Sequence, residues 1–360
     1  MDAVETGPMQ GRMANWTDRV ARAGLEHAYF AQHRAAVRIG LPLHLVSHLF
    51  DRTGEPPPLH LVRRVQALHR ALLEEDLQDA LAGTYPLKLL FDWRHVLRPT
   101  RWPGLFSDLF RVRGRRDSKA WRIDVDPAVL SRFPPYYRRQ YHWQGGGYLT
   151  DASARRYDLG VELLFLGAAD VMRRRVLPPI LQAMDRVDGG VPRVLDVACG
   201  TGRTLGMLAT ARPHAAYTGV DLSPAYIREA RRNLGQVDTL SLLVHDGRSL
   251  PFPDGTFDVV TSTYLFHELP PAGREAVLAE LFRVCAPGGT VVVEDSAQEH
   301  DLRPVERILH AFQENLHEPF FAHYLTDPLE TRVADAGFVQ VRSRPVFVAK
   351  VVEGVKPVPG

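Results

Sequence analysis

A glycine-rich turn between an apolar segment and an amphipathic one carries the clearest chemistry in this sequence. Residues 193–202 read R-V-L-D-V-A-C-G-T-G, so an apolar run that contains Asp196 leads into Gly200 and Gly202. Glycines let the backbone come close to a ligand, and the helix expected to follow offers unpaired N–H groups at its N-terminus. The pattern predicts a binding site for a cofactor that carries a nucleoside.

Two more carboxylates follow the next strand-like segments. Asp221 stands about 20 positions after the glycine turn, where an acidic residue can accept both hydroxyls of an adenosine ribose. Asp246 follows the third segment, where its carboxylate can accept the exocyclic amine of adenine. The alternative is that both side chains only cap turns and helices. The G-x-G-x-x-G form of nicotinamide dehydrogenases fails, because Leu205 stands where a third Gly or Ala would pack.

Four stretches in this order resemble the class I S-adenosylmethionine-dependent methyltransferases, most closely their UbiE/Coq5-like (methyltransferase type 11) branch. They are residues 194–202, 218–223, 245–260 and 283–295. The resemblance implies S-adenosyl-L-methionine as cofactor and S-adenosyl-L-homocysteine as product. It implies that Asp196 helps to hold the amine of the methionine moiety and that Leu222 packs on adenine. The cofactor-binding residues that it implies are Tyr157, Asp196, Ala198, Gly200, Gly202, Asp221, Leu222, Asp246, Gly247, Thr263 and Tyr264.

The reacting end of the predicted site lies after the fourth strand-like segment. Methyl transfer from a sulfonium needs mainly in-line positioning of the nucleophile, and a base only where the acceptor must lose a proton. His267 can be that base for a phenol or an acidic carbon, with Glu268 orienting it. The alternative is that His267 packs in a lid or caps the helix that starts near Pro271. Asp295, at the end of the fifth segment, is the third catalytic candidate.

Aromatic residues gather in two segments that are expected to enclose an acceptor. Residues 136–158 are rich in Tyr around a triple glycine and predict a lid over an aromatic-lined cleft. Tyr157 matches the placement of a Tyr that covers the cofactor in similar methyltransferases, and Tyr148 is a substrate candidate. Tyr324, within the ring-rich segment 300–330, is a second substrate candidate. The alternative is that the rings of residues 136–158 only join two domains.

The order of the elements predicts the fold that positions these residues. Strand-like segments at 193–198, 217–221, 240–245, 257–263 and 289–295 alternate with helical segments at 202–211, 224–234 and 272–285. Such alternation is typical of a parallel sheet with helices on both faces. Two more strands, 338–341 and 346–352, are joined near Pro345 and are expected to pair antiparallel. The predicted class is α/β, a Rossmann-like, doubly wound seven-stranded sheet whose last strands are antiparallel.

The first part of the chain predicts a mostly helical domain. Apolar residues recur at helical spacing over residues 15–50 and 59–82. Residues 149–184 predict one or two long helices with a break at Pro178–Pro179. The predicted domains are therefore 1–148, helical with the aromatic and glycine-rich linker, and 149–360, which binds the cofactor.

Composition disfavours several other classes of protein. Of the 360 residues, 45% are hydrophobic and 24% charged, which is ordinary for soluble domains. Residues 1–150 hold 22 Lys and Arg against 15 Asp and Glu, and the remainder holds 22 against 27. That acidic bias of the second part disfavours nucleic acid as a partner. The composition leaves open whether the protein forms a homo-oligomer.

Targeting and metal signals are also missing from the pattern. The start of the chain lacks a basic-then-apolar leader, and no run approaches the roughly 20 apolar residues of a membrane span. A cytoplasmic location is the expectation. Two cysteines are too few for a disulfide framework, and no Cys/His spacing matches a zinc site, so no metal is expected.

Together these residues predict a methyltransferase that moves the methyl group of S-adenosylmethionine to oxygen or carbon of a small hydrophobic acceptor. A phenol, a quinol or a natural-product-like molecule fits best. Methylation of nitrogen or of a protein is disfavoured, because residues 262–265 read S-T-Y-L in place of the N-P-P-Y type motif of amide and base methylators. Two alternatives keep the fold. One is a regulatory module that binds the cofactor without transferring methyl, and the other is a protein that uses the charge of the sulfonium for a rearrangement.

Overall fold

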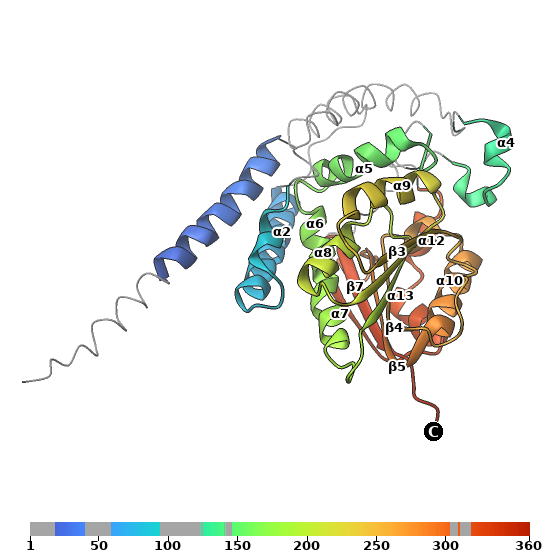
Figure 1. Ribbon diagram of the computed structural model, residues 1–360. Helices are drawn as coiled ribbons and strands as arrows, with labels where there is room; N and C mark the ends of the chain where they lie inside the picture. The colour runs from blue at the N-terminus through green and yellow to red at the C-terminus, as the bar shows by residue number, and fades with distance from the viewer. Residues whose placement is uncertain are drawn as a thin grey trace, which may run out of the picture.

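A seven-stranded sheet forms the centre of the molecule (Figure 1). The computed structural model describes residues 19–39, 59–93, 123, 125–139, 141, 146–302, 309 and 318–360. The strands are β1 (Arg193–Val197), β2 (Ala216–Asp221), β3 (Leu240–Val244), β4 (Phe257–Thr263), β5 (Cys285–Ser296), β6 (Val339–Val346) and β7 (Ala349–Val355). Their order is β3-β2-β1-β4-β5-β7-β6; β1 to β5 are parallel, and β7 is antiparallel to both neighbours. The predicted fold class is confirmed.

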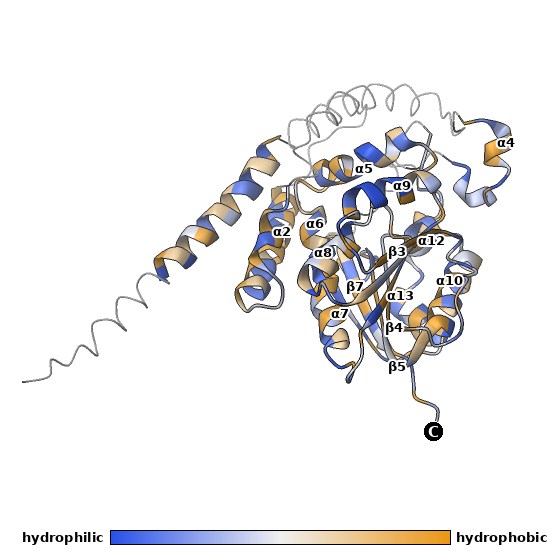
Figure 2. Ribbon diagram, in the orientation of Figure 1, coloured by the Kyte–Doolittle hydropathy of each residue, from blue (hydrophilic) through white to orange (hydrophobic). Residues whose placement is uncertain are grey.

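Helices cover both faces of this sheet (Figure 1). On one face α7 (Leu177–Met184), α8 (Arg203–Ala211) and α9 (Pro224–Leu234) pack side by side. On the other face lie α10 (Pro271–Val284) and α13 (Leu329–Asp335), which also contact each other. The solvent side of α9 is strongly hydrophilic (Figure 2). The described chain further contains α2 (Leu59–Leu81), η1 (Leu87–Phe91), α4 (Pro127–Leu130), η3 (Pro135–Tyr137), α5 (Asp151–Leu164), α6 (Ala169–Arg173), η5 (Arg174–Val176), η6 (Phe266–Glu268) and α12 (Phe321–Leu325).

The order of the strands reverses between β1 and β4. These two strands are neighbours in the sheet, although β2 and β3 separate them in the chain. Open α/β sheets bind ligands in the crevice at the carboxyl ends of the strands at such a reversal. The glycine turn follows β1, and Tyr264 follows β4, so both predicted elements of the site lie at this crevice.

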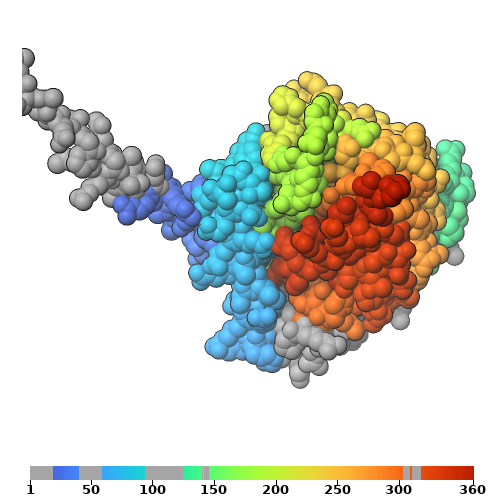
Figure 3. Space-filling model, turned by 90° about the horizontal axis from the view of Figure 1, so that it is seen from below, coloured from blue at the N-terminus to red at the C-terminus, as the bar shows by residue number. Residues whose placement is uncertain are grey.

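The N-terminal helices pack against the sheet domain. Residues 19–39 are helical, as is α2, and the rest of the helix expected over 15–50 lies outside the described residues. Tyr29 and the α2 residues Leu72 and Leu77 are buried in one hydrophobic cluster with the residues of the central strands. The space-filling view shows α2 against the C-terminal strands (Figure 3), where Arg344 of β6 donates to Glu75 of α2 at 2.8 Å. No helix in the described part of the chain has the length and apolarity that crossing a membrane requires.

Two predicted boundaries were wrong. The last two strands turn at Phe347, where φ is +59°, and Pro345 lies inside β6. Proline is tolerated there because β6 is an edge strand, which among the described strands pairs with β7 alone. The break within residues 149–184 falls at Leu166 and Gly167, whose φ values are +53° and +83°. The pair Pro178–Pro179 stands in the first turn of α7, where a missing N–H costs little.

Candidate active site

Three residues of the turn after β1 have a left-handed backbone conformation. Ala198, Gly200 and Gly202 have φ values of +61°, +55° and +80°. A Cβ added at Gly202 would lie 2.5 Å from Leu234 Cδ1, so that glycine allows α8 and α9 to pack closely. A Cβ added at Gly200 would meet nothing nearer than Tyr226 Cδ1 at 3.9 Å. The backbone at Gly200 is therefore bordered by space that a ligand can occupy.

A cavity of about 970 Å³, partly open to solvent, lies over this turn. Nine of the eleven residues predicted to bind the cofactor line it, namely Tyr157, Ala198, Gly200, Asp221, Leu222, Asp246, Gly247, Thr263 and Tyr264. Asp196 and Gly202 are not among the residues that line it. The structure thus brings together residues that come from the ends of β1, β2, β3 and β4 and from α5.

Asp221 connects the end of β2 to the glycine turn. Its carboxylate accepts the N–H of Gly200 at 2.9 Å and the N–H of Ser223 at 2.7 Å. Burial raises the pKa of this carboxyl to about 6, although both N–H donors act in the opposite direction. Above that pH the group is a buried anion at the cavity wall. It can still accept hydrogen bonds from a ligand diol, since each carboxylate oxygen has two lone pairs.

Asp196 is a buried carboxyl group without a partner. Both oxygens are buried, and neither has a hydrogen-bond partner among the described residues. Burial, together with the charge of Asp221, raises the pKa of Asp196 well above its ordinary value, while Arg173 acts in the opposite direction. A buried polar group without a partner is costly, and a bound cation would relieve that cost. Asp196 is thus an unpartnered carboxyl group directly before the glycine turn, although its side chain does not line the cavity.

Asp246 is placed differently from the other two carboxylates. Both of its oxygens are engaged by Arg248, with Nε and Nη2 at 3.1 Å and 2.7 Å from Oδ2 and the backbone N at 2.9 Å from Oδ1. Burial raises the pKa of Asp246, but the hydrogen bonds from Arg248 outweigh it and leave the pKa below its usual range. Arg248 also lies over the ring of Tyr136 at 5.0 Å. A ligand amine would have to share Asp246 with this arginine.

Two arginines on the cavity wall escaped the sequence analysis. Arg173, at the end of α6, lines the cavity and lies over the ring of Tyr264 at 5.8 Å. Arg203, the first residue of α8, lines it as well. Both bind Asp170, and the distance from Arg173 Nη1 to Asp170 Oδ1 is 3.2 Å. The sequence did hold one signal for Arg203. It directly follows Gly202 of the glycine turn, where a cationic side chain can contact an anionic group of a bound ligand.

A second cavity, which is also partly open to solvent, adjoins the first, and its volume of about 550 Å³ includes that open space. Tyr157 and Tyr264 belong to the walls of both. The other residues that line it are Val161, Leu164, Phe165, His267, Ser296, Leu309, Glu318, Phe321 and Val348. The lining is mainly apolar, with His267 and Glu318 as its ionisable groups apart from the two tyrosines. Such a cavity suits an apolar molecule that carries one polar group.

His267 is oriented by Asp295, which corrects the prediction that Glu268 does so. The distance from His267 Nδ1 to Asp295 Oδ1 is 2.6 Å, whereas its Nε2 lies 3.8 Å from Glu268 Oε1. Asp295 is held in turn by the backbone N–H of Phe266 at 2.6 Å. Burial lowers the pKa of His267, but the carboxylate of Asp295 outweighs it and raises the pKa to about 10. This shift favours the protonated ring at neutral pH, whereas the predicted role as a base needs the neutral ring.

Glu268 and Tyr148 form a pair in the wall of the first cavity. The Tyr148 hydroxyl donates to Glu268 Oε1, and the Tyr148 ring stacks on Tyr141 with the centroids 5.3 Å apart. Both Tyr148 and Glu268 line the first cavity and not the second. The structure thus places the substrate candidate Tyr148 beside the predicted cofactor residues.

Tyr324 lines neither of these cavities, contrary to its prediction as a substrate residue. Its hydroxyl donates to the carbonyl of Ser296 at 2.5 Å, and its ring packs 6.2 Å from that of His267. The side chain is fully buried. Tyr324 therefore holds the end of β5, and of the residues of α12 it is Phe321 that lines the second cavity.

Metal chemistry finds no support in the described residues. They contain no group of three or more His, Cys, Asp or Glu side chains that could hold a metal ion. Cys199 lines the first cavity, and burial raises the pKa of its thiol well above the ordinary value. The histidines His44, His48 and His142 and the basic residues 111–122 lie outside the described residues.

Comparison with known proteins identifies the family. Residues 194–289 match the family described as "Methyltransferase domain". The malonyl-[acyl-carrier protein] O-methyltransferase of Geobacter sulfurreducens is 33% identical over 201 residues, which are 54% of this chain and 73% of that protein. The chain belongs to the class I S-adenosylmethionine-dependent methyltransferases. Membership of this family makes S-adenosylmethionine the cofactor, as predicted from the motifs.

Two other relatives of this protein are named as enzymes of quinone methylation or biosynthesis. The demethylmenaquinone methyltransferase of Thermus thermophilus is 40% identical over 141 residues, 39% of this chain and 60% of that protein. The ubiquinone/menaquinone biosynthesis C-methyltransferase UbiE of Desulfotalea psychrophila is 35% identical over 165 residues, 46% of this chain and 61% of that protein. The chain therefore spans about 60% of the length of these two relatives.

Proposed function

We propose that this protein moves the methyl group of S-adenosylmethionine to oxygen or carbon of a small hydrophobic acceptor of the phenol or quinol class. The observation that carries the proposal is the pair of adjoining cavities. One is lined by the carboxylates and glycines that suit the cofactor, the other is mainly apolar, and Tyr157 and Tyr264 belong to both. The names of two relatives, both quinone methyltransferases, support an acceptor of this class.

The first cavity fits the cofactor residue by residue. Asp221 would accept the ribose hydroxyls, and Leu222 would pack on the adenine. Asp196, whose oxygens lack partners among the described residues, would accept the ammonium of the methionine part. Arg173 and Arg203 would hold its carboxylate, since arginine binds planar anions with two parallel hydrogen bonds. When bound there, S-adenosylmethionine supplies an electrophilic methyl group.

The second cavity would orient the acceptor toward that methyl group. Its apolar side chains, among them Val161, Leu164 and Phe165, would exclude water and hold the body of the acceptor. Tyr157 and Tyr264 would border the junction through which the nucleophile reaches the methyl carbon. Methyl transfer gains most of its rate from such in-line positioning.

His267 would stabilise an anionic acceptor oxygen. Asp295 holds its Nδ1, and its pKa of about 10 keeps the ring charged at neutral pH. A fixed cation beside a hydroxyl group lowers the pKa of that hydroxyl, so the ionised and more nucleophilic form of a phenol is favoured. Glu318, the other charged group of the cavity, opposes this effect in part. We therefore give His267 an electrostatic role in this proposal and Asp295 a positioning role.

The test is transfer of an isotopically labelled methyl group. The full chain would be incubated with S-adenosylmethionine that carries a heavy methyl group and with a panel of hydroquinones, phenols and 1,3-dicarbonyl compounds. The proposal expects S-adenosylhomocysteine and one product whose mass includes the heavy methyl group. An unlabelled product isomeric with its substrate would contradict it and indicate a rearrangement. Binding of S-adenosylhomocysteine without any product from the whole panel would also count against it, in favour of a regulatory module.

A further inference from the structure

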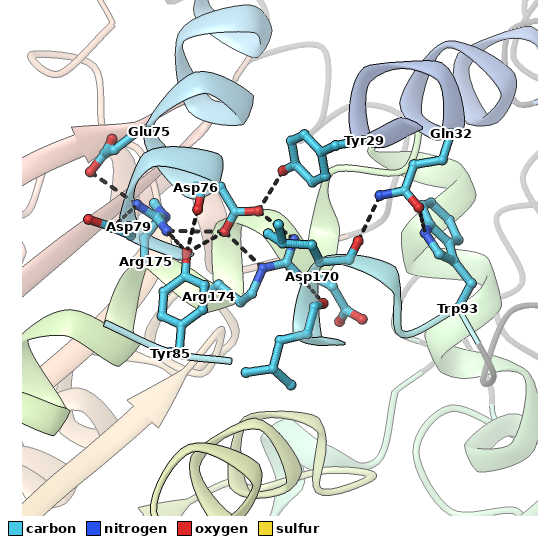
Figure 4. Close-up of polar contacts among 12 residues, drawn as sticks. Tyr29, Gln32, Glu75, Asp76, Asp79, Tyr85, Trp93, Asp170, Arg174 and Arg175 are labelled. Carbon is cyan, nitrogen blue, oxygen red and sulfur yellow. Dashed lines mark hydrogen bonds and ion pairs between the residues drawn. The ribbon is translucent and has the colours of Figure 1, made fainter. Parts of the chain in front are cut away.

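Asp76 of α2 lies at the centre of a buried polar network that joins the N-terminal helices to the sheet domain (Figure 4). Its oxygens accept from Arg174, with Nε–Oδ1 at 2.8 Å and Nη2–Oδ2 at 2.7 Å, and from Arg175 at 3.1 Å. The hydroxyls of Tyr29 and Tyr85 donate to the same carboxylate at 2.5 Å and 2.7 Å. Five donors on one buried carboxylate leave Arg174 and Arg175 little freedom to move.

The residue before this pair reaches the cofactor cavity. Arg173 precedes Arg174 directly, and its side chain lines the cavity. Asp170, one helical turn earlier, accepts from Arg173 and also from Arg203, so one carboxylate holds both cavity arginines. Because the N-terminal helices fix the backbone at Arg174, they also fix the point from which Arg173 projects.

A second connection reaches Arg203 from the other side. Asp92 follows η1, and its Oδ2 lies 3.4 Å from Arg203 Nη1. Gln32, on the helix of residues 19–39, braces this segment from both sides: its Nε2 donates to the carbonyl of Leu90 at 2.7 Å, and its Oε1 accepts from Trp93 Nε1 at 2.8 Å. Figure 4 shows the two contacts of Gln32 beside the Asp76 network.

We propose that the N-terminal helices complete the cofactor site, since Asp76 and Asp92 position Arg173 and Arg203 for the carboxylate of the cofactor's amino-acid part. The inference rests on the proposed function. It makes residues 19–39 and 59–93 part of the site and not only an appended domain. Asp92 contacts Arg203 directly, and Asp76 holds Arg174 and Arg175, the neighbours of Arg173. Among the described residues, the hydrogen bonds of Asp76 and Asp92 do not reach Asp221, Leu222 or Asp246, so we expect their effect on binding to be specific to ligands that carry the carboxylate.

Calorimetric binding of two ligands tests this inference. S-adenosylhomocysteine carries the carboxylate, and its decarboxylated analogue S-adenosyl-3-thiopropylamine lacks only that group. Asp92→Asn removes one positioning hydrogen bond. It should therefore lower the affinity for S-adenosylhomocysteine by about 2- to 12-fold and leave the affinity for the decarboxylated analogue unchanged. Asp92→Glu should restore part of the loss. The control is Glu74→Gln, which makes the same kind of change at an exposed ion pair with Arg70 on α2.

A variant of the target arginine completes the design. Asp92→Asn should have no further effect in a protein that already carries Arg203→Gln, because both changes act on the same contact. Equal affinities of the wild type and Asp92→Asn for S-adenosylhomocysteine would overturn the inference. An equal loss of affinity for both ligands would overturn it as well, since it would indicate that the substitution disturbs the fold of the site as a whole. Failure of the wild type to bind either ligand is a different result, because it contradicts the proposed function itself.

Discussion

Replacement of Asp221 by alanine should weaken the binding of S-adenosylhomocysteine far more than replacement of Asp246. The Asp221 carboxylate is buried and holds the glycine turn through the N–H of Gly200 at 2.9 Å. Hydrogen bonds to a charged group contribute about 1.5–3 kcal/mol, so loss of the contact with the ribose diol corresponds to about 10- to 150-fold in Kd. Asp246 already has Arg248 on both oxygens and is partly exposed. Its loss should cost about 0.5–1 kcal/mol, or about 2- to 5-fold.

Isothermal calorimetry on the two alanine variants and on Asp221→Asn measures this difference. The asparagine variant keeps the shape of the side chain and one acceptor oxygen, so its affinity should lie between those of the wild type and Asp221→Ala. Thermal unfolding and circular dichroism would show whether each variant keeps its fold. If folded Asp221→Ala binds within about twofold of the wild type, or if Asp246→Ala has the larger effect, the reasoning about the nucleoside end of the site is refuted.

Three other predictions concern pH and structure. Binding of S-adenosylhomocysteine should weaken as the pH falls from 7 to 5, because the ionised Asp221 carboxylate is the form that accepts the ribose hydroxyls and its pKa in the free protein is about 6; calorimetry across this range should give a flatter profile for Asp221→Asn. The pKa of folded His267, about 10, lies above the unfolded value of about 6.5, so its stabilising contribution is complete below pH 6.5 and is lost as the pH rises through 10. The melting temperature of the wild type should therefore fall more between pH 7 and 10.5 than that of His267→Gln, and parallel curves would contradict the ion pair with Asp295. Tyr324→Phe should lower the free energy of unfolding by about 1 kcal/mol, through loss of the bond to the Ser296 carbonyl, and leave the affinity for S-adenosylhomocysteine unchanged; urea denaturation and calorimetry check both, and a large loss of affinity would return Tyr324 to the site.

The fold could be predicted because local pattern and tertiary structure agree in the second half of the chain. The strands that became β1 and β4 read as short apolar runs with helices between them, and parallel strands place their carboxyl ends at one edge. That rule alone brings Asp196, Asp221 and Asp246 toward one crevice. The turn at Phe347 was missed, because a proline two positions earlier is a strong turn signal that an edge strand can nevertheless absorb.

The reacting end could be predicted less well, because it depends on contacts between distant segments. Asp295 meets His267 across 28 positions in the chain, since β5 pairs with β4 and ends beside the loop that follows β4. Glu268 is adjacent in sequence but turns toward Tyr148. The pairing of Arg203 with Asp92 spans 111 positions and depends on how the N-terminal helices pack, which periodicity does not reveal.

The central claim is that the cofactor lies over the glycine turn with its sulfur facing the second cavity. A crystal structure of the full chain with S-adenosylhomocysteine tests it most directly. The account predicts the ribose on Asp221, the ammonium on Asp196, and the sulfur at the junction bordered by Tyr157 and Tyr264, open toward His267. A sulfur atom turned away from that junction, or a ligand bound elsewhere on the protein, would contradict it.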